Sequence, residues 1–186
     1  KIEHQILPIK DVYNSFFSTL EKEFINKEPD ITEENLQSRC RGVLLMALSN
    51  KSGDLVLTTG NKSETAVGYS TLYGDTAGGF AVLKDVPKTL VYRLADYRNT
   101  LSKAIPQRII DRPPTAELSE DQKDSDSLPD YPVLDGILQI LVDQDGSIAD
   151  CVAAGYAKAD AKRVEHLLYM SEYKRFQSEI VFVLCG

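Results

Sequence analysis

The chain has 186 residues, of which 42% are hydrophobic and 26% are charged. These proportions are typical of a globular protein with a buried core, and they exclude a disordered chain or a fibre. The formal net charge of -7 argues against nonspecific nucleic-acid binding, which relies on Lys and Arg to neutralise phosphates. No apolar run approaches the roughly 20 residues of a membrane helix, and the start lacks a secretory signal. We therefore expect one cytoplasmic domain over residues 1–186.

The first fifty residues predict a strand followed by two helices. Residues 4–9 read as a short strand, and the apolar positions of residues 11–26 have helical spacing. Asp30 and Glu33 have the spacing of a capping box that opens the second helix. Gly42 lies inside that helix at a cost of about 1 kcal/mol relative to Ala, which indicates close approach by another backbone or a ligand. The stripe expected to face inward is Leu36, Cys40, Val43, Leu44 and Ala47.

A strand is predicted at residues 54–59, and it runs into a cluster of small, hydroxyl and charged residues. The letters are LVLTTGNKSETAVGYSTLYGD over residues 55–75. Open α/β sheets bind nucleotides at junctions of this kind, although many strands end in glycine-rich turns without a ligand. A short helix from Lys62 and a glycine-bearing loop over residues 74–79 are expected to follow.

Pro87 marks the first turn of a longer helix that we expect to be capped by Asp85 and to end near residue 102. Its inward positions are predicted to be Leu90, Val91, Leu94 and Leu101. Residues 112–130 are polar, acidic and proline-punctuated, so they predict a mobile loop within the domain. Further helices are expected at residues 133–143, 147–153 and 159–176.

The cysteines and histidines indicate no catalytic or metal site. Cys40, Cys151 and Cys185 are far apart and odd in number, which predicts reduced core thiols rather than a disulfide framework or a zinc site. His4 and His166 carry no motif, and we expect His166 to be packed or exposed on its helix.

Residues 34–75, with the letters ENLQSRCRG and GNKSETAVGYSTLYGD, closely resemble the synthetase domain of NAD synthetases, especially the glutamine-dependent branch. Four further matches follow in the same order: KDVPKTLVYRLADYRN at 84–99, RPPTAEL at 112–118, DQKDSDSLP at 121–129 and EYKR at 172–175. The resemblance implies an α/β fold of the adenine nucleotide alpha hydrolase-like (ATP pyrophosphatase) type. That fold is an open, mostly parallel sheet with helices on both faces.

The resemblance also implies an ATP-dependent ligase that converts deamido-NAD into NAD. Mg²⁺ and ATP would adenylate the nicotinate carboxylate, and ammonia, free or derived from glutamine, would then displace AMP. Such a step requires cations around the phosphates and an oriented carboxylate. The family resemblance further implies a homodimer, and the acidic loop at 112–130 resembles the family's lid, which would exclude water.

Three residues match ATP contacts of the family, namely Thr59, Lys88 and Thr115, and Glu64 matches an acidic residue at the magnesium and substrate site. A lysine suits a triphosphate because it is a compact, mobile charge. Each residue also has a structural explanation. Thr59 can be an ordinary strand-end hydroxyl, and Glu64 can form a capping box with Asn61.

A second set matches the residues with which the family contacts deamido-NAD. Arg39 would supply a planar fork of donors for phosphate or carboxylate, or it is a solvated helix residue. Lys174 is explained equally well as an exposed charge at a helix end, and the Tyr and Leu of the set as core. The full set is Asn35, Arg39, Glu64, Tyr69, Ser70, Thr71, Leu72 and Lys174.

The sequence departs from the family pattern at both ends. The family's Ser-Gly-Gly phosphate loop should precede residue 4 and is absent, so we expect an N-terminally truncated domain. After Arg175 the letters FQSEIVFVLCG also deviate. Two alternatives therefore stay open: a remnant that keeps only dinucleotide binding or dimerisation, and another ATP pyrophosphatase such as a GMP synthetase.

Overall fold

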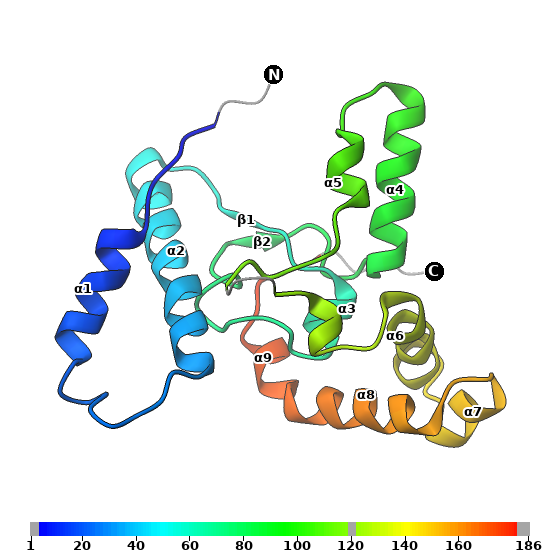
Figure 1. Ribbon diagram of the computed structural model, residues 1–186. Helices are drawn as coiled ribbons and strands as arrows, with labels where there is room; N and C mark the ends of the chain where they lie inside the picture. Colours follow the sequence, from blue (N-terminus) through cyan, green and yellow to red (C-terminus); the bar gives the residue numbers. More distant parts are fainter. Residues whose placement is uncertain (1–3, 119–121, 182–186) are drawn as a thin grey trace.

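The computed structural model describes residues 4–118 and 122–181. At its centre, β1 (Leu57–Thr58) pairs in parallel with β2 (Phe80–Ala81), with Leu57 opposite Phe80 and Thr58 opposite Ala81. The sheet lies between the pair α1–α2 and the remaining helices (Figure 1). Helices around a parallel sheet agree with the predicted α/β class, although the strand expected at 54–59 is reduced to two residues.

Two predictions at the start of the chain are wrong. Residues 4–9 form no strand, because a strand requires a hydrogen-bonded neighbour and the described sheet contains only β1 and β2. The helix expected at 11–26 is α1 (Lys10–Leu20), and residues 21–26 are turns. Asn26 has a left-handed φ of 61°, a conformation that cannot continue a helix.

The capping box of α2 (Ile31–Ser52) is confirmed. Asp30 Oδ1 accepts a 2.7 Å hydrogen bond from the backbone N–H of Thr32, and Glu33 Oε2 accepts one of 2.7 Å from that of Asp30. Part of the inward stripe is wrong, because Val43 and Ala47 are exposed. The residues buried on this helix are small ones: Ser38, Cys40 and Gly42.

Gly42 confirms the expected close approach of another backbone. A Cβ atom at this position would lie 2.9 Å from the carbonyl oxygens of both Tyr73 and Gly74. The loop after α3 therefore rests directly on α2. The nearby Ser38 Oγ also accepts a 3.1 Å hydrogen bond from the backbone N–H of Asp75. This contact is mainly between backbones, which explains why α2 buries small residues.

The helix α4 (Lys88–Leu101) begins where it was predicted but is capped differently. Asp85 does not cap it; Ser63 Oγ accepts a 2.8 Å hydrogen bond from Lys88 N, and Asp135 Oδ2 accepts one of 2.8 Å from Thr89 N. Ser63 belongs to α3 (Lys62–Ala66), and Asp135 to α6 (Tyr131–Leu138), so the tertiary fold supplies the cap.

The outer part of α4 is not inward-facing as predicted. Leu94 is 46% exposed and Leu101 is 65% exposed. The helix contacts α3 and α6, and it projects away from the centre of the molecule beside the short helix α5 (Gln107–Asp111) (Figure 1). This projection leaves room for a cavity between the two helices.

The second half of the chain is helical. A short 3₁₀ turn, η1, lies in the acidic loop, and the helix predicted at 159–176 is broken at Ser171, whose Oγ hydrogen-bonds to Leu167 O at 2.6 Å. The elements are η1 (Asp124–Asp126), α6 (Tyr131–Leu138) continued by a π-helical turn η2 (Gln139–Asp143), α7 (Ile148–Ala153), α8 (Lys158–Met170) and α9 (Glu172–Phe176).

These helices enclose the hydrophobic core, which consists of Ala66, Val67, Leu128, Leu134, Ile137, Leu138, Cys151, Ala161 and Val164.

Cys40 and Cys151 are buried free thiols, as expected, whereas Cys185 lies outside the described residues. Residues 119–121 of the acidic loop also lie outside them, and the mobility of that loop stays a prediction. Across the part of the chain that the structure describes, every helix is too short or too polar to cross a membrane.

Candidate nucleotide site

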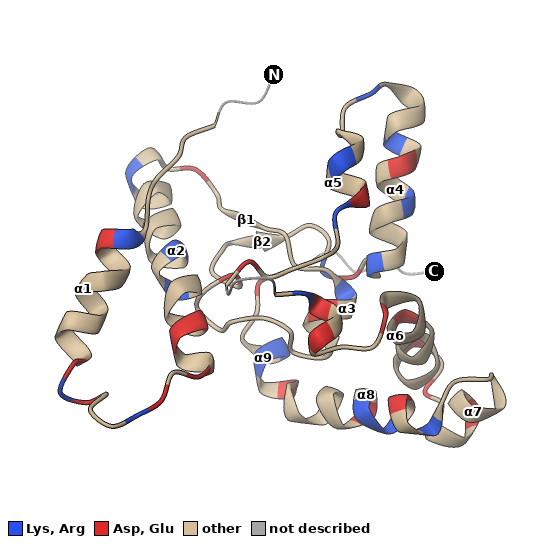
Figure 2. Ribbon diagram, in the orientation of Figure 1, with Lys and Arg blue, Asp and Glu red and all other residues tan. Residues whose placement is uncertain are grey.

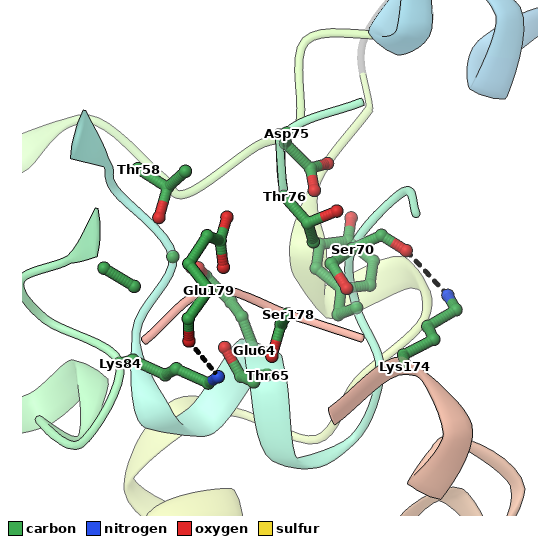
Figure 3. A pocket seen from close by; sticks show the side chains of 13 residues that line it. Thr58, Glu64, Thr65, Ser70, Asp75, Thr76, Lys84, Lys174, Ser178 and Glu179 are labelled. Atoms are coloured by element: carbon green, nitrogen blue, oxygen red, sulfur yellow. Dashed lines mark hydrogen bonds between the residues drawn. The ribbon is translucent and has the colours of Figure 1, made fainter. Parts of the chain in front are cut away.

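A small cavity of about 50 Å³ lies at the carboxyl end of β1. Thr58, Glu64 and Asp75 line it together with two lysines, Lys84 and Lys174, which approach from opposite sides (Figure 3). This is the edge at which parallel sheets place ligands. The strand alternates its side chains, so Thr58 is buried in the cavity and the predicted Thr59 is exposed beside it.

Both lysines of this cavity are held by backbone carbonyls. Lys84 Nζ donates to Glu179 O at 2.6 Å, and Lys174 Nζ donates to Ser70 O at 2.6 Å and Gly68 O at 2.8 Å. Burial lowers the pKa of each lysine below its usual value. In Lys174 the charge of Asp75 opposes this shift. The cavity therefore combines two lysines with three carboxylates, those of Glu64, Asp75 and Glu179.

A second cavity of about 180 Å³ brings together most of the residues predicted to contact deamido-NAD. Thr71 Oγ1 donates a 3.0 Å hydrogen bond to Asn35 Oδ1, which joins the loop after α3 to α2. Residues of the acidic loop close one side, including Leu118 and Gln122. The predicted residues that line this cavity are Asn35, Tyr69, Ser70, Thr71 and Lys174.

The two other predicted residues nearby, Arg39 and Leu72, do not line the second cavity. Arg39 is exposed, and its Nε donates a 3.2 Å hydrogen bond to Leu72 O. The guanidinium therefore holds the loop by its backbone, and among the described residues its other donors have no hydrogen-bond partner. Arg39 lies on the rim of the site rather than inside it.

A third cavity of about 370 Å³ lies between α4, α5 and the start of the acidic loop. It contains Lys88 and Thr115, two of the three residues predicted to contact ATP, and Arg112 adds a second cation. Apolar side chains such as Ile109 and Tyr92 cover the other walls. An apolar cavity with a few cations at its mouth is the usual form of a nucleotide or cofactor pocket.

Glu64 connects the first and third cavities. Its Oε1 atom forms a 2.8 Å ion pair with Lys88 Nζ. The alternative role of Glu64 is also confirmed, since Asn61 and Glu64 form the capping box of α3, with Glu64 N donating to Asn61 Oδ1 at 3.1 Å. The carboxylate is thus divided between the two roles, with Oε2 accepting from Asn61 N at 3.4 Å and Oε1 directed at Lys88.

Two residues that the sequence did not single out complete this group. Tyr131 Oη donates a 2.6 Å hydrogen bond to Asp124 Oδ2, and Lys88 Nζ lies 5.2 Å from the centre of the Tyr131 ring. Figure 2 shows the acidic turn η1 next to α3, in agreement with these contacts. The acidic cluster was visible in the sequence, but only the fold brings Asp124 to Tyr131.

The predicted magnesium site is not a complete protein cage. Among the described residues no three side chains of Asp, Glu, His or Cys converge. Glu64 is a single carboxylate; its Oε1 faces Lys88, and its Oε2 accepts a 3.4 Å hydrogen bond from Asn61 N. This donor set fits a Mg²⁺ ion bound largely by substrate phosphates, for which one or two carboxylates suffice.

The sequence of this chain is similar to those of known proteins. A sequence model of the family described as NAD synthase matches residues 1–178. The glutamine-dependent NAD(+) synthetase of Acinetobacter baylyi is 58% identical over 177 residues, which are 94% of this chain and 33% of that protein. The chain therefore spans about a third of the length of the curated relatives it matches.

Solved structures agree with the sequence match. A glutamine-dependent NAD+ synthetase from Acinetobacter baumannii, in complex with ADP, is 52% identical and has a TM-score of 0.54, covering 91% of this chain and 30% of that one. An NMN synthetase from Francisella tularensis is 26% identical with a TM-score of 0.76, covering 94% and 64%. The predicted fold class is confirmed, and the chain belongs to the NAD synthase family.

Proposed function

We propose that the protein containing this chain performs the ATP-dependent amidation of deamido-NAD to NAD. The observation that carries the proposal is how three cavities are joined: Lys174 lines the first and the second, and Glu64 of the first forms an ion pair with Lys88 of the third. Deamido-NAD fits the second cavity, and ATP fits the third. The first cavity, between them, is where the nicotinate carboxylate and the α-phosphate would meet.

The reaction requires two anions to approach each other, so the site has to neutralise charge. Lys88 contributes a mobile cation at the ATP phosphates, and Thr115 contributes a hydroxyl on the same wall. Lys174, fixed by Gly68 O and Ser70 O, keeps one cation near the second cavity. Preorganised charges of this kind stabilise a transition state without reorganisation during the reaction.

Binding of deamido-NAD would use the polar wall of the second cavity. The hydrogen-bonded pair Asn35 and Thr71 presents an amide and a hydroxyl, and Tyr69 presents an aromatic face on which a base or nicotinate ring can stack. Arg39 at the rim would meet a phosphate. Mg²⁺, bound by ATP with Glu64 as its protein ligand, would screen phosphate charge. The nicotinate carboxylate would attack the α-phosphate of ATP and release pyrophosphate, and ammonia, free or derived from glutamine, would then displace AMP from the acyl-adenylate.

The proposal includes a homodimer, as the family resemblance implies, and a location in the cytoplasm. Its main test is formation of NAD from deamido-NAD, ATP, Mg²⁺ and ammonium, followed by an enzymatic NAD assay. Lys88→Met is expected to reduce the rate at least 100-fold, because one preorganised charge contributes a factor of this order. Lys162→Met, an exposed substitution on α8, is the matched control and should leave the rate unchanged.

A binding assay separates the alternatives. Deamido-NAD and ATP binding without NAD formation would replace the catalytic proposal with a binding role for this chain. Turnover of xanthosine monophosphate but not deamido-NAD would assign the site to a GMP synthetase activity. Absence of any nucleotide binding would contradict all of these assignments.

A further inference from the structure

Tyr131 is located where four elements meet. It is the first residue of α6, its ring lies beneath Lys88 Nζ of α4, and its hydroxyl donates to Asp124 Oδ2 of η1 at 2.6 Å. The same hydroxyl lies 3.4 Å from Glu64 Oε1 of α3. One phenol proton can make only one strong hydrogen bond, and the shorter distance assigns it to Asp124.

Asp124 is buried and firmly attached. The residue is only 4% exposed. Its backbone N–H donates to Pro114 O at 3.1 Å, and its backbone carbonyl accepts from Leu128 N at 2.9 Å. A buried carboxylate without a partner is expensive, so the hydroxyl of Tyr131 is held strongly. Asp124 thereby fixes the orientation of the ring on which Lys88 rests.

Lys88 is consequently restrained from two sides. Glu64 attracts the ammonium directly at 2.8 Å, and the face of Tyr131 attracts it through the ring quadrupole at 5.2 Å. An incoming phosphate can compete with Glu64 for the ammonium while the aromatic face remains beneath it. A lysine otherwise has four free torsions, so this support reduces the entropy lost on binding an anion.

We propose that Tyr131 and Asp124 are positioning residues that hold Lys88 at the mouth of the third cavity and so raise affinity for the triphosphate of ATP. The proposal rests on the proposed function for the identity of the anion. It also assigns a role to the acidic loop, because Asp124 joins that loop to the lysine through one aromatic ring.

The first test needs no nucleotide, so its result does not depend on whether the proposed function is correct. The rate at which an acylating reagent modifies Lys88 is measured by mass spectrometry in the unliganded chain. Tyr131→Leu and Asp124→Asn are expected to raise this rate about tenfold. The rate at Lys162 serves as the internal reference, and Tyr97→Leu, an exposed change on α4, is the matched control. An unchanged rate at Lys88 in variants with native circular dichroism overturns the proposal.

The second test is a double-mutant cycle on ATP binding, measured by calorimetry. Tyr131→Phe keeps the ring but removes the hydroxyl, and it is expected to weaken ATP binding about fivefold in the native background. In the Lys88→Met background it should have no further effect, because the two residues act through one another. An equal loss in both backgrounds indicates a merely structural role and contradicts the proposal. If Tyr131→Leu fails to fold, Tyr131→Phe takes its place in the acylation test.

Discussion

The helices α6 to α8 and the helices α1 and α2 are held in place by different forces. Leu134, Ile137 and Val164 are completely buried among their neighbours, whereas α1 buries no residue and Val43 on α2 is 58% exposed. The first region is stabilised by apolar burial. The second is attached to the loop after α3 through side-chain hydrogen bonds of Asn35 and Ser38 and through the backbone contact at Gly42. Of the three cavities, the second is lined by α2, through Asn35, and by Lys174 of α9.

The largest expected effect is in the buried region. Ile137→Ala should lower the free energy of unfolding by about 2–5 kcal/mol, since it removes buried methylene groups and leaves a cavity. Val43→Ala removes a comparable apolar group from an exposed position, and we expect a change within about 0.5 kcal/mol. Urea unfolding of both variants measures the difference. Equal losses of unfolding free energy in the two variants would show that the two regions do not differ in their dependence on apolar burial.

Gly42→Ala should destabilise the contact of α2 with the loop after α3. The added Cβ atom would lie 2.9 Å from two backbone oxygens, which cannot rotate away, so overpacking should cost about 1–3 kcal/mol. The gain in helix propensity of about 1 kcal/mol offsets part of this. Asn50→Ala on the exposed side of α2 is the control and should be neutral or slightly stabilising. A thermal melt in which both variants are stabilised would show that the loop moves freely.

Alkaline pH should weaken the contact between the buried region and the acidic loop, which Tyr131 of α6 makes with Asp124. Burial, followed by the hydrogen bond to Asp124, raises the pKa of Tyr131 above its usual value. Above about pH 10 the unfolded chain loses this proton and the folded chain retains it, so stability falls with rising pH by up to about 1.4 kcal/mol per unit. Below pH 10 the contribution is complete. Melting curves from pH 9 to 11.5 should show a smaller slope for Tyr131→Phe, and an unchanged one for Tyr97→Phe.

The smallest effect is expected on the surface of the third cavity. Arg112 and Glu117 form a 2.7 Å ion pair whose side chains are 64% and 54% exposed. Pairs that are so open to solvent contribute within about 0–1 kcal/mol, and salt screens them. Arg112→Gln should therefore leave the unfolding midpoint nearly unchanged. A loss that persists in 1 M salt would mean that Arg112 has another structural role.

Local patterns allowed the helices with strong signals to be predicted. The capping boxes at Asp30 and Asn61 depend on side chains three residues apart, and both occur as expected. The helix at Pro87 also begins in the expected place. The strand at 4–9 and the inward face of α4 were predicted wrongly, because both depend on what lies beside them. Propensity and spacing contain no information about a neighbouring strand or helix.

The sequence alone determined the family and the candidate residues, because the order of the residues in a motif can be read without knowing the fold. Only the tertiary structure decided which of these residues face one cavity. It placed Thr58 rather than Thr59 inside, left Arg39 at the rim, and brought Asp124 to Tyr131 beneath Lys88. Contacts between distant segments are fixed by packing and by the need to satisfy buried polar groups, and both are properties of the assembled chain.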